Sequence, residues 1–336
     1  MANSASTETI GSRRQAALQS WRNMVPLLIF AVVLTIAGAL ANDFVLRFLA
    51  EILIFGIAVM SLDLLVGFGG LVSLGHAALF GGAAYAAALT AKAFGGDLVL
   101  VMIAGIVTGT ILAALIGVVV VRTANLFFLI LTLVGSQLIW EVVFHARDIT
   151  GGADGLRGLP TLSLHLGFAT ISLAGSKGLF IVVAVISVAT YAVARSFVAA
   201  PIGRALIGTR EQPLRMSALG YSIPWVRFLT LLASGAIAGA AGAVYPFVNQ
   251  YISPTALHWS TAAVMVIMLV IGGVGSLWGA YLGAAVYLGL QNYVSSYTSR
   301  WQLVVGLVFV GTVLLMPNGI AHAITSAVER LRGRSR

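Results

Sequence analysis

The stretch LVLVMIAGIVTGTILAALIGVVVV, Leu98 to Val121, contains no charged residue. As an α-helix rising about 1.5 Å per residue, it is long enough to cross a hydrocarbon core about 30 Å thick. Similar apolar runs recur from Met24 to Met316. The runs are continuously apolar, whereas the strands of an outer-membrane barrel alternate apolar and polar residues. The sequence therefore predicts an all-α polytopic membrane protein.

The composition agrees with a membrane protein, since 60% of the residues are hydrophobic and only 9% are charged. The net charge of +9 raises the alternative of nucleic-acid binding. However, the chain has no RNA-binding motif and no basic stripe interleaved with aromatic residues, so no nucleic-acid partner is expected. The absence of Cys excludes disulfides, thiolate catalysis and Cys-ligated zinc.

About ten transmembrane helices are expected from the apolar runs. Their bounds are Met24–Ala41, Glu51–Gly67, Ser73–Thr90, Leu98–Val121, Leu126–Phe144, Gly178–Ala194, Phe228–Asn249, Thr261–Gly273, Leu277–Leu290 and Trp301–Met316. The eighth and ninth are short and are separated by Gly272, Gly273 and Gly275. Alternatively, these two are half-helices that meet at membrane depth, where only protein or a cavity can shelter irregular backbone.

Basic residues predict the orientation of these helices. With the N-terminus inside, thirteen of the 19 Lys and Arg residues lie in the cytoplasm, as the positive-inside rule requires. Both termini are then cytoplasmic, and a single permease domain spans residues 24–316. It is flanked by an N-terminal segment, 1–23, and a basic tail, 317–336. The longest external loop is 146–177, and the longest internal loop is 196–227.

The first apolar segment has a second interpretation. Its Arg-rich flank and the small residues Ala39 and Ala41 also resemble a cleavable signal peptide. Charge counting does not separate the two, because cleavage leaves every later span in place. The apolar core is long for a signal peptide, which favours a retained first span.

Glycine spacing indicates how the helices pack. The pairs Gly105/Gly109, Gly235/Gly239 and Gly279/Gly283 are each G-xxx-G patterns, which let the backbones of two membrane helices approach closely. Glycine is also common in membrane helices generally, so the pairs predict a tightly packed bundle and no function.

Polar residues within the spans are candidates for a translocation path, because a charge at membrane depth costs at least about 2.5 kcal/mol. Glu51 and Glu141 lie near outer ends, which favours simple interfacial solvation. The remaining candidates are Asp63, Ser73, His76, Thr132 and Gln137. For His76, Thr132 and Gln137, a hydrogen bond to a neighbouring helix is the alternative to lining a path. No metal site is predicted.

Enzymatic interpretations find no support in the sequence. There is no H-E-x-x-H motif and no carboxylate pair at one depth. The P-loop motif G-x-x-x-x-G-K-[ST] needs a Lys, and neither Lys92 nor Lys177 fits it. If ATP drives transport, a separate chain must bind the ATP and Mg²⁺ and hydrolyse the nucleotide.

A charged island, Gly203 to Arg227, interrupts the apolar sequence. Gly203–Glu211 predicts one short helix, and Pro213 and Gly220 bracket a second. Both are too short to be stable alone. They suit a docking element for a soluble partner, although an ordinary solvated loop is the alternative.

Four sequence blocks together carry a resemblance. They are Gly67-Phe68-Gly69-Gly70-Leu71-Val72-Ser73-Leu74-Gly75-His76-Ala77-Ala78; Thr150-Gly151-Gly152-Ala153-Asp154-Gly155-Leu156; Gly203-Arg204-Ala205-Leu206 with Arg210-Glu211 and Ala218-Leu219-Gly220; and Gly272-Gly273-Val274-Gly275-Ser276-Leu277-Trp278-Gly279. In this order they resemble the LivM branch of the branched-chain amino acid ABC transporter permeases, from about Asp43 to Pro317.

The resemblance implies a type II-like importer permease in the bacterial inner membrane. Its partners would be two cytoplasmic ABC ATPases, a second, LivH-like permease and a periplasmic binding protein. The residues implied to dock the ATPase are Gly203, Arg204, Arg210, Glu211, Leu214 and Gly220. Those implied to face the binding protein are Thr150, Gly151, Gly152 and Asp154. The expected solute is a branched-chain or related amino acid.

Departures from the family pattern keep alternatives open. Leu71 stands where the family often has Gln, and Asn125 where it often has Gly. Both put a branched-chain solute in doubt, and the urea- or amide-importing branch is the alternative. Pro213, Arg215 and Met216 replace a usual Glu-x-Ala-Ala, which suggests a matched ATPase. A self-contained secondary transporter or channel is the alternative class.

Overall fold

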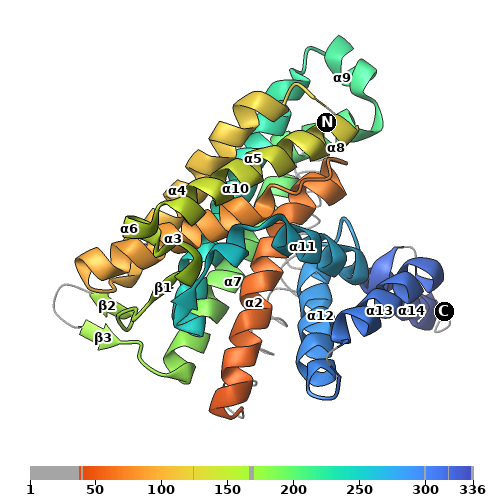
Figure 1. Cartoon of the computed structure of the whole chain (residues 1–336). Helices are drawn as coiled ribbons and strands as arrows, with labels where there is room; N and C mark the ends of the chain where they lie inside the picture. Colours follow the sequence, from red (N-terminus) through yellow and green to blue (C-terminus); the bar gives the residue numbers. More distant parts are fainter. Residues whose placement is uncertain are drawn as a thin grey trace, which may run out of the picture.

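The computed structural model describes residues 38, 41–123, 125–165, 170–298, 300–316 and 318–333. Within these residues the chain is predominantly helical, with four short strands (Figure 1). The predicted N-terminal segment, 1–23, lies outside the described residues. All but two residues of the predicted first span, Met24–Ala41, also lie outside the described residues. The structure therefore does not test the signal-peptide interpretation.

Each of the other predicted spans overlaps a helix. These helices are α2 (Asp43–Asp63), α3 (His76–Phe94), α4 (Leu98–Val120), α5 (Asn125–His145), α7 (Ser176–Ala199), α10 (Ile223–Asn249), α11 (Trp259–Gly272), α12 (Gly279–Ser295) and α13 (Trp301–Leu315). A short π-helix, η1 (Leu64–Phe68), continues α2. Insertions of this kind are rare and are often found at functional sites.

Fewer helices span a membrane by length than the ten expected. Within the described residues, α2 with η1, α3, α4, α5, α7 and α10 qualify, which makes six. A seventh results if α13 and the first part of α14 (Gly319–Gly333), bent by 44°, count as one span. The helix α11 has 14 residues and reaches only about 21 Å. The count of about ten is therefore not confirmed, because α11, α12 and α13 are each too short to span a membrane alone, and the predicted first span lies outside the described residues.

The centre of the bundle is α10, which packs against α3, α4 and α2. Two of the predicted glycine pairs face each other across α4 and α10. An added Cβ at Gly105 would lie 2.8 Å from the carbonyl oxygen of Gly239. One at Gly109 would lie 2.8 Å from the Cα of Gly239. The third pair, on α12, faces α11: a Cβ at Gly279 would lie 2.8 Å from the carbonyl oxygen of Gly272. The tight packing predicted from G-xxx-G spacing is confirmed.

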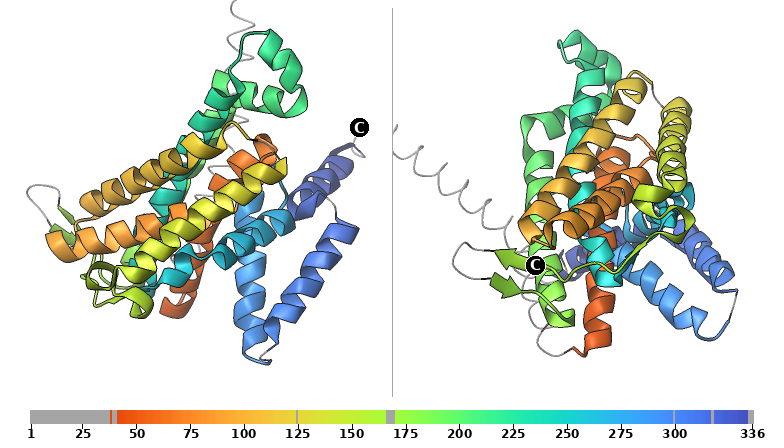
Figure 2. Two further views of the ribbon diagram at one scale, coloured as in Figure 1. Left: turned by 45° about the horizontal axis from the view of Figure 1, so that its top comes forward. Right: turned by 60° about the vertical axis from the view of Figure 1, so that its left-hand side comes forward.

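Opposite ends of the bundle carry different elements (Figures 1 and 2). At one end lie α8 (Pro201–Glu211) and α9 (Pro213–Ala218), the two short helices predicted from the sequence. At the other lie α6 (Arg147–Thr150), the 3-10 turn η2 (Gly152–Asp154) and the strands. The strands are β1 (Leu156–Arg157), which pairs antiparallel with β4 (Tyr251–Ile252), and β2 (Ser163–His165), which pairs with β3 (Thr170–Ser172).

The C-terminal helices α12, α13 and α14, drawn in blue, form a lobe on one side of the bundle (Figures 1 and 2). The helix α14 packs against α11 and α12. Gly319, at the start of α14, has a φ of 77°, and an added Cβ there would lie 2.5 Å from the backbone nitrogen of Gly273. No helix was expected in this basic tail.

Irregular backbone enters the bundle between α10 and α11. The 3-10 turn η3 (Pro254–Leu257) lies between α3 and α5, and strand β4 before it contacts α3 and α10. An added Cβ on Gly81, in α3, would lie 2.8 Å from the backbone of Ala256. The Ser136 hydroxyl, in the middle of α5, donates to the carbonyl of Leu257 at 3.4 Å. Non-helical backbone therefore enters the bundle here as well as at the turn after Gly272, where Gly273 and Leu277 are buried.

Candidate functional site

Asp63 joins two sequence blocks at the end of α2. Its side chain is fully buried, and its Oδ1 accepts a hydrogen bond from the backbone N–H of Gly275 at 2.7 Å. The close approach requires glycine at position 67, since an added Cβ there would lie 2.6 Å from the Cα of Gly275. The other oxygen, Oδ2, is buried without a hydrogen-bond partner among the described residues. Asp63 therefore fastens the turn between α11 and α12 to the end of α2.

Arg210 connects the same junction to α8. Its guanidinium Nη1 donates to the carbonyl oxygen of Gly67, in η1. Gly70, with a φ of 67°, lies directly against this side chain, because an added Cβ would be 2.9 Å from Cγ of Arg210. Arg210 also interacts electrostatically with Asp63. Three of the four sequence blocks thus meet at Asp63, Gly67, Arg210 and Gly275.

Other members of the predicted docking set lie on the surface of the α8–α9 pair. Arg204, Glu211 and Gly220 are exposed, and Leu214 is 87% exposed. Gly203 is buried, and an added Cβ there would lie 2.6 Å from the Cα of Val198 in α7. Gly203 therefore sets the angle between α7 and α8, whereas the exposed residues leave a free surface at this end of the molecule (Figure 1).

His76 ties three helices together. Its Nε2 lies 2.7 Å from the Ser234 hydroxyl in α10, which donates at 2.6 Å to the carbonyl of Ser61 in α2. Its Nδ1 lies 3.2 Å from the Ser73 hydroxyl, which also accepts the N–H of Gly75 at 3.2 Å. One set of protons satisfies every group: Nε2–H donates to Ser234, and Ser73 donates to Nδ1. The structure therefore shows the alternative given in the sequence analysis, a histidine hydrogen-bonded to a neighbouring helix. Ser73 belongs to the same set of hydrogen bonds.

Thr132 and Gln137 lie on α5. The Thr132 hydroxyl donates to the carbonyl of Leu129 at 2.9 Å and accepts the N–H of Leu74 at 3.2 Å, so it holds the turn before α3. Gln137 differs, because its Oε1 is buried and has no partner among the described residues. Of the five candidates for a translocation path, Gln137 and Asp63 each keep an unpaired polar atom inside the bundle.

The block that begins at Thr150 lies at the end opposite α8 and α9. The Thr150 hydroxyl bonds the carbonyls of Val143 at 2.6 Å and Ala146 at 2.8 Å, which secures the end of α5. Gly151 and Gly152 have φ of 75° and 56°, a region that favours glycine. Asp154 is exposed.

This block is fastened to the segment that enters the bundle. Strand β1 pairs with β4, and the Arg157 guanidinium stacks over the Tyr251 ring at 5.0 Å. Gly155 also lies against the segment, since an added Cβ would be 3.0 Å from the Cα of Ser253.

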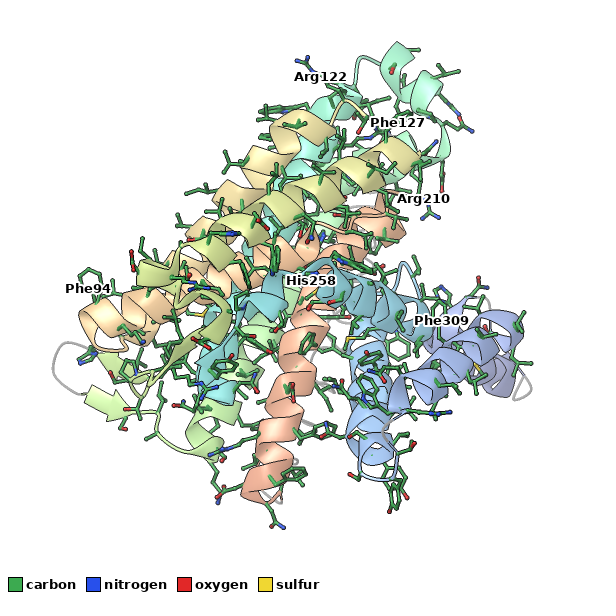
Figure 3. All side chains as sticks on the ribbon, viewed as in Figure 1. Phe94, Arg122, Phe127, Arg210, His258 and Phe309 are labelled. Atoms are coloured by element: carbon green, nitrogen blue, oxygen red, sulfur yellow. The ribbon has the colours of Figure 1, made fainter. Side chains whose placement is uncertain are left out.

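A pocket of about 280 Å³ lies where this block, α5 and η3 meet. Its lining residues are Trp140, Phe144, Ala153, Pro254, Thr255 and His258. In Figure 3, His258 lies near the middle of the view, between Phe94 at one end and Arg122, Phe127 and Arg210 at the other.

A family model described as the permease component of the branched-chain amino acid transport system matches residues 44–315. The chain belongs to this permease family. The matched region includes all four sequence blocks and, apart from Asp43, every helix from α2 to α13.

Two relatives are high-affinity branched-chain amino acid transport permease proteins LivM, from Salmonella typhimurium and Escherichia coli. Each is 24% identical over 281 residues, which cover 78% of this chain and 66% of the relative. The chain thus spans slightly less than two thirds of their length. A probable LivH permease from Methanocaldococcus jannaschii is 25% identical over 147 residues, 40% of this chain and 44% of the relative. No solved structure gives a significant match.

Departures from the permease family pattern are accommodated locally. Asn125 has a φ of 53°, a left-handed conformation that glycine adopts freely and Asn tolerates better than most residues. Leu71 is buried in an apolar cluster with Leu65 and Phe128. Met216 packs against the cluster of Ala205, Leu206 and Val226, and so holds α9 against α8. The exposed Arg215 lies 3.4 Å from Gln212.

Sequence reasoning missed the pocket, including Trp140, Phe144, Thr255 and His258. One local signal was available, because the polar residues Ser253 and His258 and the helix-disfavouring Pro254 lie between two apolar spans. The pocket itself needs contacts between residues far apart in the sequence, which no local pattern contains.

Proposed function

We propose that this chain is the permease subunit of an ATP-driven importer that carries branched-chain or related amino acids across the bacterial inner membrane. Membership of the permease family and similarity to two LivM proteins support this function. The finer architecture belongs to the same proposal: a type II-like fold with about ten helices, with residues 24–41 as the first span and both termini in the cytoplasm. The distribution of Lys and Arg supports that orientation.

The proposed assembly contains this chain, a second LivH-like permease, two cytoplasmic ABC ATPases and a periplasmic binding protein. Similarity to both LivM and LivH proteins supports a permease pair. The chain is a transport subunit and not an enzyme, and ATP and Mg²⁺ bind the ATPase subunits.

The observation that carries the proposal is the contact between Arg210 and the Gly67 carbonyl. It links α8, on the exposed surface proposed to dock an ATPase, to the end of α2. From there Asp63 reaches the turn between α11 and α12 through Gly275. A movement of α8 and α9 would therefore be transmitted through the end of α2 to α11 and α12. An importer driven by separate ATPases requires such a connection.

The proposal is tested by purifying the tagged protein from its native membranes in mild detergent and identifying bound chains by mass spectrometry. We expect a P-loop ATPase and a second permease. The variant Leu214→Asp should lose the ATPase and keep the permease, because Leu214 is highly exposed on α9. Phe94→Ala, exposed at the opposite end, is the control. A secondary transporter or channel would purify without an ATPase and transport in its absence.

A further inference from the structure

The pocket between α5, η2 and η3 has a mostly apolar wall. The Trp140 and Phe144 rings stack with centroids 5.0 Å apart, and the His258 ring meets Trp140 edge-on at 5.5 Å. Pro254 adds a further apolar surface. The volume of about 280 Å³ has room for several waters, each of which occupies about 30 Å³ in the liquid. The pocket therefore fits one small solute.

Polar groups are present at one side of this pocket. Nδ1 of His258 is occupied at the start of α11, where it accepts from the backbone N–H of Ser260 at 3.4 Å and lies 2.9 Å from the Ser260 hydroxyl. In the neutral ring the proton then lies on Nε2, which has no hydrogen-bond partner in the part of the chain that the structure describes. Thr255, also in the lining, is exposed. The pocket thus combines aromatic walls with a free hydrogen-bond donor.

The pocket is partly open to the surface, and irregular backbone forms one of its walls. The backbone of η3 is not α-helical and lies against the middle of α3 and α5. Such backbone occurs at membrane depth only where protein shelters it or where it lines a cavity. Pro254, Thr255 and His258 do line one.

A second unpaired group lies further along the same helix. Gln137, Trp140 and Phe144 are spaced i, i+3 and i+7 on α5, so they share one face. Gln137 is one turn from Trp140 toward the α8–α9 end, and its Oε1 is buried and unpaired. A buried acceptor without a partner in a folded protein calls for water or a ligand.

We propose that this pocket binds the transported solute within the permease, as an amino acid with an aliphatic side chain. This rests on the proposed function. The side chain packs against Trp140, Phe144 and Pro254, while Nε2–H of His258 donates to the carboxylate. Gln137 is the next acceptor that the ammonium group meets on its way inward. The permease then selects its solute itself, in addition to any selection by the binding protein.

The chain contains no Cys, so single cysteines report on the pocket without interference. The variants Thr255→Cys and, separately, Ala153→Cys would be prepared in the assembled permease–ATPase complex without binding protein. Labelling by a maleimide would then be timed with and without L-leucine. At ten times its half-saturating concentration, leucine should slow labelling about tenfold by mass action. Phe94→Cys, exposed outside the pocket, should label at one rate throughout.

One measurement made first separates the proposed function from the pocket proposal. It is the ATP-driven uptake of L-leucine into proteoliposomes by the wild-type complex with its binding protein. No uptake would count against the proposed function. Uptake in the wild type, with unchanged labelling of both pocket cysteines in leucine, would overturn the pocket proposal alone.

Two further variants test selection. Trp140→Ala should lower leucine uptake relative to alanine uptake about tenfold, with Trp140→Phe intermediate. His258→Asn keeps an acceptor for the start of α11 and removes Nε2–H. Combined with Thr255→Cys, it should therefore weaken the protection that leucine gives to the introduced thiol. An unchanged leucine-to-alanine ratio in both Trp140 variants contradicts the proposal.

Discussion

Asp63 and Gly275, 212 residues apart in the sequence, are joined by a carboxylate that accepts a backbone N–H at 2.7 Å. One carboxylate oxygen makes this bond, and the other is buried and unpaired close to the charge of Arg210. The arrangement holds the turn between α11 and α12 against α2. It also places a buried carboxyl group at the point where α8 contacts the bundle.

Substitutions at Asp63 should separate these two roles. Asp63→Asn keeps an acceptor for Gly275 but removes the ionisable carboxyl group beside Arg210, so we expect an assembled complex with uptake reduced several-fold. Asp63→Ala also leaves the Gly275 N–H unpaired, which costs about 1–3 kcal/mol and should lower the thermal stability in detergent. Uptake into proteoliposomes and size-exclusion chromatography after heating are the measurements. Normal uptake by Asp63→Asn would return this residue to a purely structural role.

Arg210 is expected to couple ATP hydrolysis to transport rather than to hold the ATPase. Its guanidinium bonds the chain's own Gly67 carbonyl, so Arg210→Ala should leave the ATPase bound and hydrolysing while uptake falls at least about tenfold. Arg210→Lys cannot reproduce the planar guanidinium geometry. Its uptake should therefore lie between that of the wild type and that of Arg210→Ala. Uptake per ATP hydrolysed is the quantity to measure.

Arg215→Ala provides the matched control, because Arg215 is exposed on α9 and its one side-chain hydrogen bond within the described residues is the long contact with Gln212. Equal losses in uptake per ATP for the Arg210 and Arg215 variants would show that charge on this surface matters and the Gly67 contact does not.

His76 is expected to stabilise the bundle, not to move protons or solute. His76→Ala removes the bonds to Ser73 and Ser234 and leaves a cavity among α2, α3 and α10. Each membrane hydrogen bond contributes about 0.6 kcal/mol, and the cavity adds a further 2 kcal/mol or so. The prediction is a clear drop in the temperature at which the detergent-solubilised protein aggregates. Ser234→Ala removes one partner without a large cavity, and its effect should be smaller. Unaltered stability with lost uptake would instead place His76 on the path.

The sequence was sufficient for features that depend on neighbouring residues. Apolar runs located the long helices α2, α3, α4, α5, α7, α10, α11, α12 and α13, and Pro213 and Gly220 bracketed α9, because helix length and helix ends are local properties. Local patterns could not show that His76 pairs with Ser234, 158 residues away. Nor could they show that Arg210 turns back onto Gly67. The pocket was missed for the same reason, since its walls come from α5, η2 and the segment around η3.

The contact between α4 and α10 should be the part of the bundle least tolerant of added volume. In Gly109→Ala, the new methyl would lie 2.8 Å from the Cα of Gly239, closer than real Cβ atoms approach, so the helices must separate. Overpacking of this kind costs about 1–3 kcal/mol. Gly306→Ala is the control, because an added Cβ at Gly306 meets no atom within 4 Å and alanine favours a helix over glycine by about 0.5–1 kcal/mol. We therefore expect a lower aggregation temperature for the first variant and an unchanged or slightly higher one for the second. A similar response of both variants would mean that glycine at position 109 serves backbone flexibility and not the approach of the two helices.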